Sequence, residues 1–107
     1  MRRGTTPTEG FELDTPTLDL TTLTQVWLTI CDGRDKSFTW DISRLSSIDN
    51  ENKILWFTFT QQETLAFATG LATVDIRMLT SSGAALATDY SIIEIHDTQK
   101  DGVITNE

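Results

Sequence analysis

The strongest constraint on the fold of this chain is a strict alternation of apolar and polar residues in short segments. In "TQVWLTIC", residues 24–31, Val26, Leu28 and Ile30 occupy every second position. A period of two places these three side chains on one face of an extended strand, which then buries that face. No segment longer than about ten residues repeats its apolar side chains at helical spacing. The chain therefore predicts strands around a shared interior rather than a parallel sheet covered by helices.

The strand at residues 24–31 and the next strand along the chain are predicted to form a hairpin. Asp32-Gly33 follows residue 31, and this pair favours a tight turn because glycine adopts positive φ without a steric penalty. The return strand is "SFTWDI", residues 37–42. Its side chains expected in the interior are Phe38, Trp40 and Ile42.

Four further segments alternate in the same way, which gives six predicted strands in all. These segments are residues 11–15, 54–60, 72–78 and 90–95. The side chains that they are expected to bury include Leu55, Phe57, Phe59, Ala72, Val74, Ile76, Met78, Ile93 and Ile95. The stretch at 43–53 is read as a polar connection, and residues 80–85 as a turn.

One segment, about residues 61–69, changes from alternation to helical spacing. Thr60 and Glu63 stand three residues apart, as in a capping box, where each side chain accepts a hydrogen bond from the other residue's backbone N–H. Gly70 follows where a left-handed C-cap would lie. We interpret this short helix as a connector between two sheets, with Leu65 filling the end of the interior.

These elements predict an all-β protein: an antiparallel immunoglobulin-like β-sandwich with one short connecting helix. With 107 residues the chain has room for one domain. We expect residues 1–9 to be an extended N-terminal arm, because no large apolar side chain follows Met1. Residues 10–97 form the sandwich in this prediction, and residues 98–107 form a C-terminal tail.

The charge of the chain argues against two classes of partner. Sixteen acidic and eight basic residues give a formal net charge of −8. A field of this sign repels phosphate backbones and anionic lipid surfaces, so no nucleic-acid partner is expected. No apolar run of about 18 residues is present, and no hydrophobic stretch follows the two arginines at the start, so neither a membrane span nor a secretory signal is predicted.

Residues that could carry chemistry are isolated from one another in the sequence. Cys31 is the only cysteine, and His96 is the only histidine. A metal ligand set or a catalytic base needs partners at fixed geometry, and neither residue has them nearby. The oxygen-rich stretch at 49–52 lacks the spacing of a calcium loop and suits a turn. No catalytic residue, cofactor or metal is predicted.

Four apolar or aromatic side chains fall on the faces opposite the predicted interior. They are Trp27, Trp56, Tyr90 and Ile92. Contiguous exposed apolar surface usually marks a protein interface. Alternatively, a loop, the N-terminal arm or the helical turn covers these side chains within the monomer. The alternation rule leaves both possibilities open.

Several motifs resemble a family of short virion proteins encoded by phages and prophages of Gram-positive and gut bacteria. These motifs are "MRRGTTPT", "QVWLTI", "FTQQETLAF" and "VDIRMLTSSGAALAT", and together they span nearly the whole chain. The first motif and "TQQETLAF" with its following glycine and strand are the most specific. The segment "ENKILWFTF" is more aromatic than the family pattern. The strand plan is also distantly similar to the immunoglobulin-like N-terminal domain of phage baseplate upper proteins.

The resemblance implies a non-enzymatic structural component of a tailed phage particle, at the tail tip, the baseplate or a capsid accessory position. It implies a virion location after synthesis in the bacterial host cytoplasm. The implied partners are other virion proteins and the protein itself, in a homo- or hetero-oligomer. The residues expected at these contacts are Arg2, Arg3, Thr5 and Thr6 of the arm, with Trp27, Trp56, Tyr90 and Ile92.

Two other functions remain open from the sequence. Exposed tryptophans also suit a carbohydrate- or host-surface-binding module, in which they stack on sugars. An acidic inhibitor of a host nucleic-acid-binding protein would instead gather carboxylates on one face, and the candidates for this are Glu12, Asp14, Asp41 and Asp75.

Overall fold

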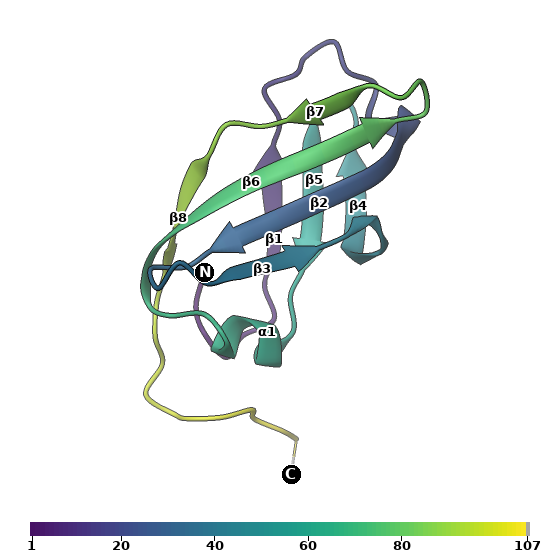
Figure 1. Ribbon diagram of the computed structural model, residues 1–107. Coiled ribbons are helices and arrows are strands. Elements are labelled where there is room, and N and C mark those ends of the chain that lie inside the picture. The colour runs from purple at the N-terminus through teal and green to yellow at the C-terminus, as the bar shows by residue number, and fades with distance from the viewer. Residues whose placement is uncertain (107) are drawn as a thin grey trace.

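The computed structural model describes residues 1–106, which form eight strands, one α-helix and two short 3-10 turns (Figure 1). The strands are β1 (Thr8–Glu12), β2 (Leu23–Cys31), β3 (Ser37–Trp40), β4 (Leu45–Asp49), β5 (Ile54–Thr58), β6 (Gly70–Thr80), β7 (Ala85–Ala87) and β8 (Ser91–Ile95). The helix α1 is Gln61–Leu65, and the 3-10 turns are η1 (Leu20–Thr22) and η2 (Ile42–Arg44).

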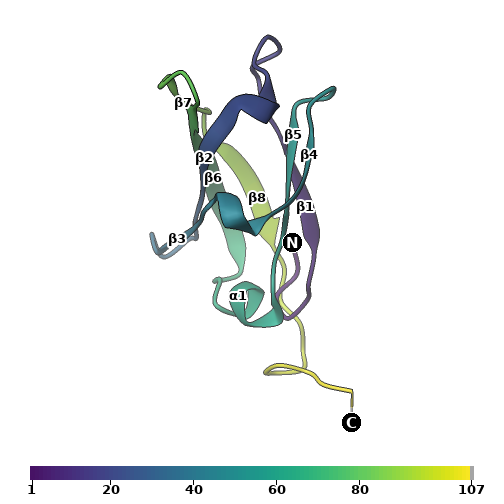
Figure 2. The same cartoon turned by 90° about the vertical axis from the view of Figure 1, so that its right-hand side faces the viewer.

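The strands form two antiparallel sheets packed face to face. The smaller sheet has the order β1-β5-β4. In the larger sheet β3 pairs with β2 and β2 with β6, while β7 and β8 follow one another along the far edge of β6. Figure 2 shows the two layers from the side, with α1 across their lower end. The predicted all-β antiparallel sandwich with one short helix is confirmed.

The interior contains the alternating side chains that the sequence predicts. Val26, Leu28 and Ile30 are fully buried, and β2 pairs with β6 so that Leu28 lies opposite Ile76. The ring of Trp40 packs edge-on against Phe59, with centroids 5.0 Å apart. Side chains from both layers therefore close one apolar core, whose buried members are Leu13, Leu20, Val26, Leu28, Ile30, Trp40, Leu55, Phe57, Phe59, Phe67, Ala72, Val74, Ile76, Met78 and Ile95.

Two strands lie where the sequence predicts a connection and a turn. β4 occupies part of the predicted polar connection at 43–53. The apolar–polar alternation does not reveal it, because its three central residues are all exposed and no alternate positions are buried. Its pairing with β5 also shifts register between Leu45 and Ser47. β7 is only three residues long. Both are edge strands, whose outer positions tolerate polar and small side chains.

The predicted arm at residues 1–9 is part of the sandwich, which is a correction to the predicted boundary at residue 10. Met1 and Arg3 lie against the edge of β8: the backbone N–H of Arg3 donates to His96 and that of His96 donates to Met1, both at 2.8 Å. Further along, the Gly4 N–H donates to the hydroxyl of Thr64. The strand expected at 11–15 begins earlier, at Thr8. Backbone pairing thus orders a segment with few apolar side chains, which the hydrophobic pattern does not reveal.

The capping box that starts α1 is confirmed, but the helix is shorter than predicted. The Glu63 N–H donates to the Thr60 hydroxyl at 3.2 Å, and the Thr60 N–H donates to the Glu63 carboxylate at 2.8 Å. The helix ends at Leu65 rather than near residue 69. Gly70 has a positive φ of 110°, but it begins β6 and does not cap the helix. Phe67, rather than the half-buried Leu65, fills this end of the interior.

Candidate functional site

Of the eight large apolar side chains that are exposed among the described residues, most lie on the outer face of the larger sheet. Five of them point away from the core on β2, β6 and the segment leading through β8. Their exposed fractions are 45% for Trp27, 64% for Leu71, 39% for Leu79, 77% for Tyr90 and 67% for Ile92. Exposed apolar side chains grouped on one face of a monomer mark an interaction surface. We call these five residues the outer patch.

The strand register explains why these residues share one face. Trp27 lies opposite Arg77, and Leu79 lies opposite Gln25, so both apolar side chains stand at the same end of the β2–β6 pair. Ile92 lies opposite Thr73 near the other end of β6. The buried residues of the same strands point to the core, which leaves the intervening positions facing outward. The nine residues of β2 and eleven of β6 hold the patch on a continuous ladder.

Trp56 does not join the outer patch. It lies on β5 of the smaller sheet, opposite Gly10 of β1, and its side chain is partly buried. A Cβ atom on Gly10 would lie 2.8 Å from two carbons of the Trp56 ring, so the ring rests across the glycine. Trp27 and Trp56 therefore belong to opposite outer faces of the sandwich, and β1 provides part of the cover for Trp56.

Three of the four expected contact residues of the N-terminal segment make hydrogen bonds within the chain. Arg3 donates to the Asp97 carboxylate at 2.7 Å and to the Leu65 carbonyl at 2.8 Å. Arg2 donates to the Asp97 carbonyl, and the Thr5 hydroxyl donates to the Arg2 carbonyl. Thr6 is exposed. The hydrogen-bonding groups of Arg2, Arg3 and Thr5 thus hold the N-terminus on the body of the domain.

A buried carboxylate ties the β2–β3 turn to the segment after α1. The Asp32 side chain is fully buried and accepts hydrogen bonds from the Arg34 guanidinium at 2.6 Å and from the Ala68 N–H at 3.0 Å. The Arg34 guanidinium also donates to the Ala66 carbonyl. These bonds, foremost those from Arg34, lower the pKa of Asp32 well below its usual range despite its burial. These contacts fix one end of the sandwich.

A second carboxylate joins α1 to β3 and η2. Glu63 accepts from both terminal nitrogens of Arg44 at 2.7 Å and from the indole N–H of Trp40 at 2.5 Å. The hydrogen bonds from Arg44 are the main cause of a lowered pKa for Glu63, from 4.5 to about 2, with Thr60 and Trp40 adding to the effect. The carboxylate is ionised at neutral pH and its contacts are structural. The sequence marks Glu63 as a helix cap but does not reveal that it also binds Arg44 and Trp40.

The lowered pKa of Glu63 predicts a pH-dependent stability. Because its folded pKa is depressed, its contribution is present above about pH 4.5 and is lost as the pH falls toward about 2. Allowing for partial solvent access, we expect Glu63→Gln to lower the free energy of unfolding at neutral pH by about 2 kcal/mol. Urea titrations at several pH values should show the gap between wild type and variant closing in acid. An equal gap at all pH values would contradict this role.

The remaining polar candidates from the sequence do not form a reactive site. The side chain of His96 is exposed, with a nitrogen 3.9 Å from the Glu94 carboxylate, and Cys31 is half-buried. Asp49 accepts from the Asn52 backbone and side chain, as a turn residue does. Within residues 1–106, no group of three or more histidine, cysteine or acidic side chains is arranged to hold a metal ion.

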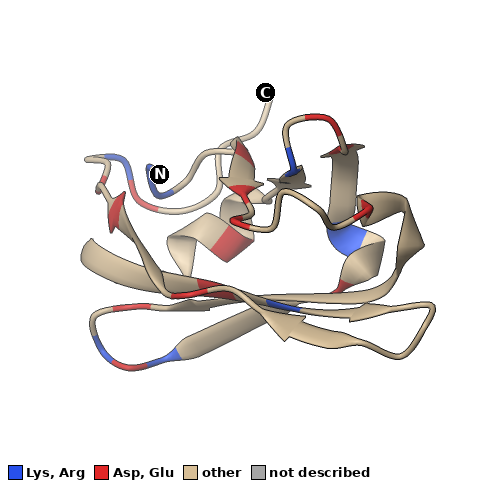
Figure 3. Ribbon diagram, turned by 90° about the horizontal axis from the view of Figure 1, so that it is seen from above, with Lys and Arg blue, Asp and Glu red and all other residues tan. Residues whose placement is uncertain are grey.

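The four carboxylates considered for charge mimicry do not share one face. Glu12 points outward from β1 on the smaller sheet, whereas Asp75 lies on the outer face of the larger sheet. Asp41 caps η2 through Ser43. Figure 3 shows acidic positions spread over both layers. This distribution does not favour an acidic inhibitor built on these four residues.

No family model matches the chain, and neither a curated protein nor a solved structure matches it. In the described part of the chain, no helix combines the length and the apolar character needed to cross a membrane. A function for this chain therefore has to be proposed from its own sequence motifs and surfaces.

Proposed function

We propose that this protein is a non-enzymatic structural component of a tailed phage particle, and that it contacts its neighbours through the outer patch. The observation that carries the proposal is the exposure of Trp27, Leu71, Leu79, Tyr90 and Ile92 on one face of a rigid sheet. The motifs "MRRGTTPT" and "FTQQETLAF" support the phage setting through their resemblance to short virion proteins. The location is the virion, at the tail tip, the baseplate or a capsid accessory position.

The chemistry of the outer patch suits a packing surface between subunits. Aromatic residues are enriched in the centres of protein interfaces, and Trp27 is a large, rigid side chain near one end of the patch. Arg77 lies opposite Trp27 on the next strand, where it can pair with an acidic group of a neighbour. A net charge of −8 opposes self-association, so burial of the apolar side chains has to supply the favourable free energy for any contact between copies.

The outer patch predicts a specific assembly defect. We expect the double variant Trp27→Ser/Ile92→Ser to reduce incorporation into particles by at least about tenfold, because two anchors of the contact are lost. The control is Ile48→Ser, which removes an exposed apolar side chain from the smaller sheet. Quantitative mass spectrometry of purified particles should detect the control at the wild-type level. Surface substitutions of this kind change the free energy of unfolding by roughly 0.5 kcal/mol or less, which circular dichroism in urea can verify.

Two results would overturn the proposal. Wild-type protein that is absent from purified particles would exclude a virion component. Normal incorporation of the folded double variant would exclude the outer patch as the contact. A carbohydrate-binding module is the second candidate, because the exposed rings of Trp27 and Tyr90 could stack on sugars. Binding of the isolated monomer to a glycan array, abolished by Trp27→Ser, would favour that function instead.

A further inference from the structure

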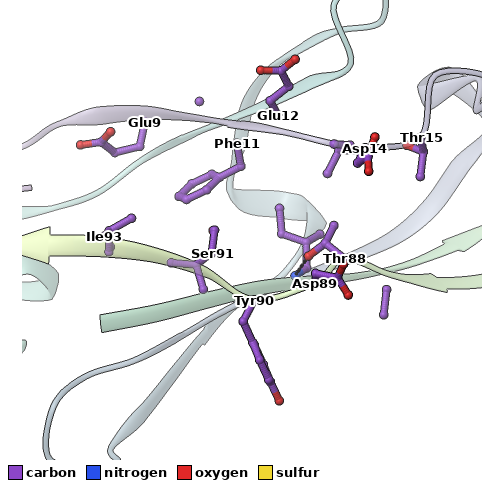
Figure 4. Close-up of a pocket in the computed structure, with 15 residues that line it drawn as sticks. Glu9, Phe11, Glu12, Asp14, Thr15, Thr88, Asp89, Tyr90, Ser91 and Ile93 are labelled. Carbon is purple, nitrogen blue, oxygen red and sulfur yellow. Dashed lines mark hydrogen bonds between the residues drawn. The ribbon is translucent and has the colours of Figure 1, made fainter. Parts of the chain in front are cut away.

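A groove runs along one open side of the sandwich, and Tyr90 is the one outer-patch residue that also lines it. It lies between β1 on the smaller sheet and the β7–β8 segment on the larger one, and its volume is about 540 Å³. Figure 4 shows Phe11 and Ile93 pointing into it from opposite sides, while Tyr90 points away. Val74 and Ile76 form part of its floor. The groove therefore has an apolar base between two strand edges.

The edge of β1 that borders the groove has unpaired backbone groups. The Phe59 N–H donates to the Pro7 carbonyl, and the Leu13 N–H donates to the Lys53 carbonyl. Because bonded and non-bonded positions alternate in an antiparallel ladder, the residues between them that face away from β5 are Thr8, Gly10 and Glu12. The N–H and C=O groups of these residues are directed to the free edge, where another extended chain can pair with them.

The edge of β8 is already partly covered by an extended basic segment. The Met1 amino group donates to the Glu94 carbonyl at 2.8 Å, and Arg2 forms a parallel bridge with His96. Glu94 and His96 direct their backbone groups away from β6 toward this N-terminal segment. Ile92, two residues before Glu94, directs its N–H and C=O groups to the same edge, but the N-terminal segment does not extend far enough to pair with them. The fold itself thus shows that this side of the sandwich accepts an arginine-bearing extended chain, and that the covered stretch ends at the groove.

The walls of the groove carry negative charge without a compensating cation. Four acidic residues line it, and no lysine, arginine or histidine does; the four are Glu9, Glu12, Asp14 and Asp89, of which Glu12 directs its carboxylate away from the groove (Figure 4). Within residues 1–106 none of the four accepts a side-chain hydrogen bond or an ion pair, in contrast to Asp32 and Glu63. A ligand with lysine or arginine side chains would supply the missing positive charge.

We infer that the groove binds an extended segment of a partner protein that carries basic and apolar side chains on one face, at every second position. The segment adds as a strand to β1. Glu9 and Phe11 lie two residues apart on β1 and share a face, so an apolar side chain of the segment covers Phe11 and Ile93 while basic side chains on the same face pair with Glu9 and Asp89. The five residues of β1 match about five residues of bound chain. This inference does not depend on the proposed virion role, because the four residues that it uses, Glu9, Phe11, Asp89 and Ile93, lie outside the outer patch.

A second copy of this chain is a poorer occupant. Its only pair of adjacent basic residues, Arg2 and Arg3, is held on its own domain. The acidic side chains elsewhere on a second copy, whose net charge is −8, would be repelled by the carboxylates of the groove. An inward-pointing charge such as Glu9 also discourages edge-to-edge pairing of identical sheets, so the acidic edge both excludes copies and selects a basic partner.

The test uses a short blocked peptide, added to the full-length protein, in which lysine and valine alternate at every second position and serine stands between them, so that both share one face. We expect shifts of the Thr8, Gly10 and Glu12 amide signals in NMR spectra and saturable binding in calorimetry. Two comparison peptides separate the contributions. A glutamate–valine peptide tests charge, and an N-methylated lysine–valine peptide tests backbone pairing; each is expected to bind at least about tenfold more weakly.

A pair of matched variants locates the site. Glu9→Gln/Asp89→Asn is expected to weaken binding of the lysine–valine peptide by about tenfold, the loss of two partly screened ion pairs. Glu51→Gln/Asp101→Asn removes the same charge at exposed positions elsewhere and should change the affinity less than about twofold. Equal weakening by both variants, equal binding of the N-methylated peptide, amide shifts confined to the outer patch, or no binding at about millimolar peptide would overturn the inference. So would concentration-dependent dimerisation through these same amides.

Discussion

Asp32→Ala is expected to lower the free energy of unfolding by about 3–4 kcal/mol. The Asp32 carboxylate is fully buried and accepts hydrogen bonds from the Arg34 side chain and from the backbone N–H groups of Arg34 and Ala68. Alanine removes the acceptor for all of these donors at once. Urea denaturation monitored by tryptophan fluorescence would measure the loss, because the three tryptophans report on both sheets.

The control for Asp32 is Glu51→Ala, which removes an exposed carboxylate from the β4–β5 turn. We expect this control to change stability by no more than roughly 0.5 kcal/mol. The pH dependence gives a second test. Since the pKa of Asp32 is lowered on folding, its contribution is present above its unfolded value of about 3.8 and declines as the pH falls further. A gap between wild type and Asp32→Asn that stays constant into acid would contradict the proposed role of the charge.

The larger sheet could be predicted from the sequence because its central strands are buried on one face and solvated on the other. In β2 and β6 every second residue is apolar, and the structure buries those positions. The same rule places Trp27 and Ile92 outside, and it also fits Leu71 and Leu79. Extending the alternation over the whole of β6 would have added these two leucines to the predicted surface.

The N-terminal segment and the groove could not be predicted in this way, because they depend on backbone pairing and on contacts distant in the sequence. Met1 to Arg3 pair with residues more than ninety positions away. Glu9 and Asp89 line the same open side of the sandwich, which exists only once β1 and β8 have joined different sheets. Periodicity reports which face of an element is buried; it carries no information about which strand edges face one another.

The two surfaces give the domain different ways of making contact. The outer patch presents apolar side chains on a continuous ladder, so its contacts rely on packing between preformed surfaces. The groove presents unpaired backbone groups and carboxylates, so it selects for chain direction, charge and an extended conformation. The buried carboxylate of Asp32 and the partly buried carboxylate of Glu63 hold the turn and helix at one end of the layers. Under the two proposals, the domain would contact one kind of neighbour through the outer patch and another through the groove.

Phe57→Ala is the second substitution expected to have a large effect, with a loss of about 4 kcal/mol in the free energy of unfolding. Phe57 is fully buried on the central strand of the smaller sheet, and its ring packs edge-on against Phe11 with centroids 6.0 Å apart. Removing the ring leaves a cavity between the two layers and withdraws support from Phe11. For a domain of this size the melting temperature should fall by about 20 °C, measured by differential scanning calorimetry.

Ile48→Ala is the matched control for Phe57, because it shortens an exposed apolar side chain in the same sheet. We expect it to shift the melting temperature by only a few degrees, about what 0.5 kcal/mol gives. A loss below about 1 kcal/mol for Phe57→Ala would mean that the two layers do not close on a shared interior around this ring. The groove would then lose its base as well, because Phe11 lines it from a strand that Phe57 supports.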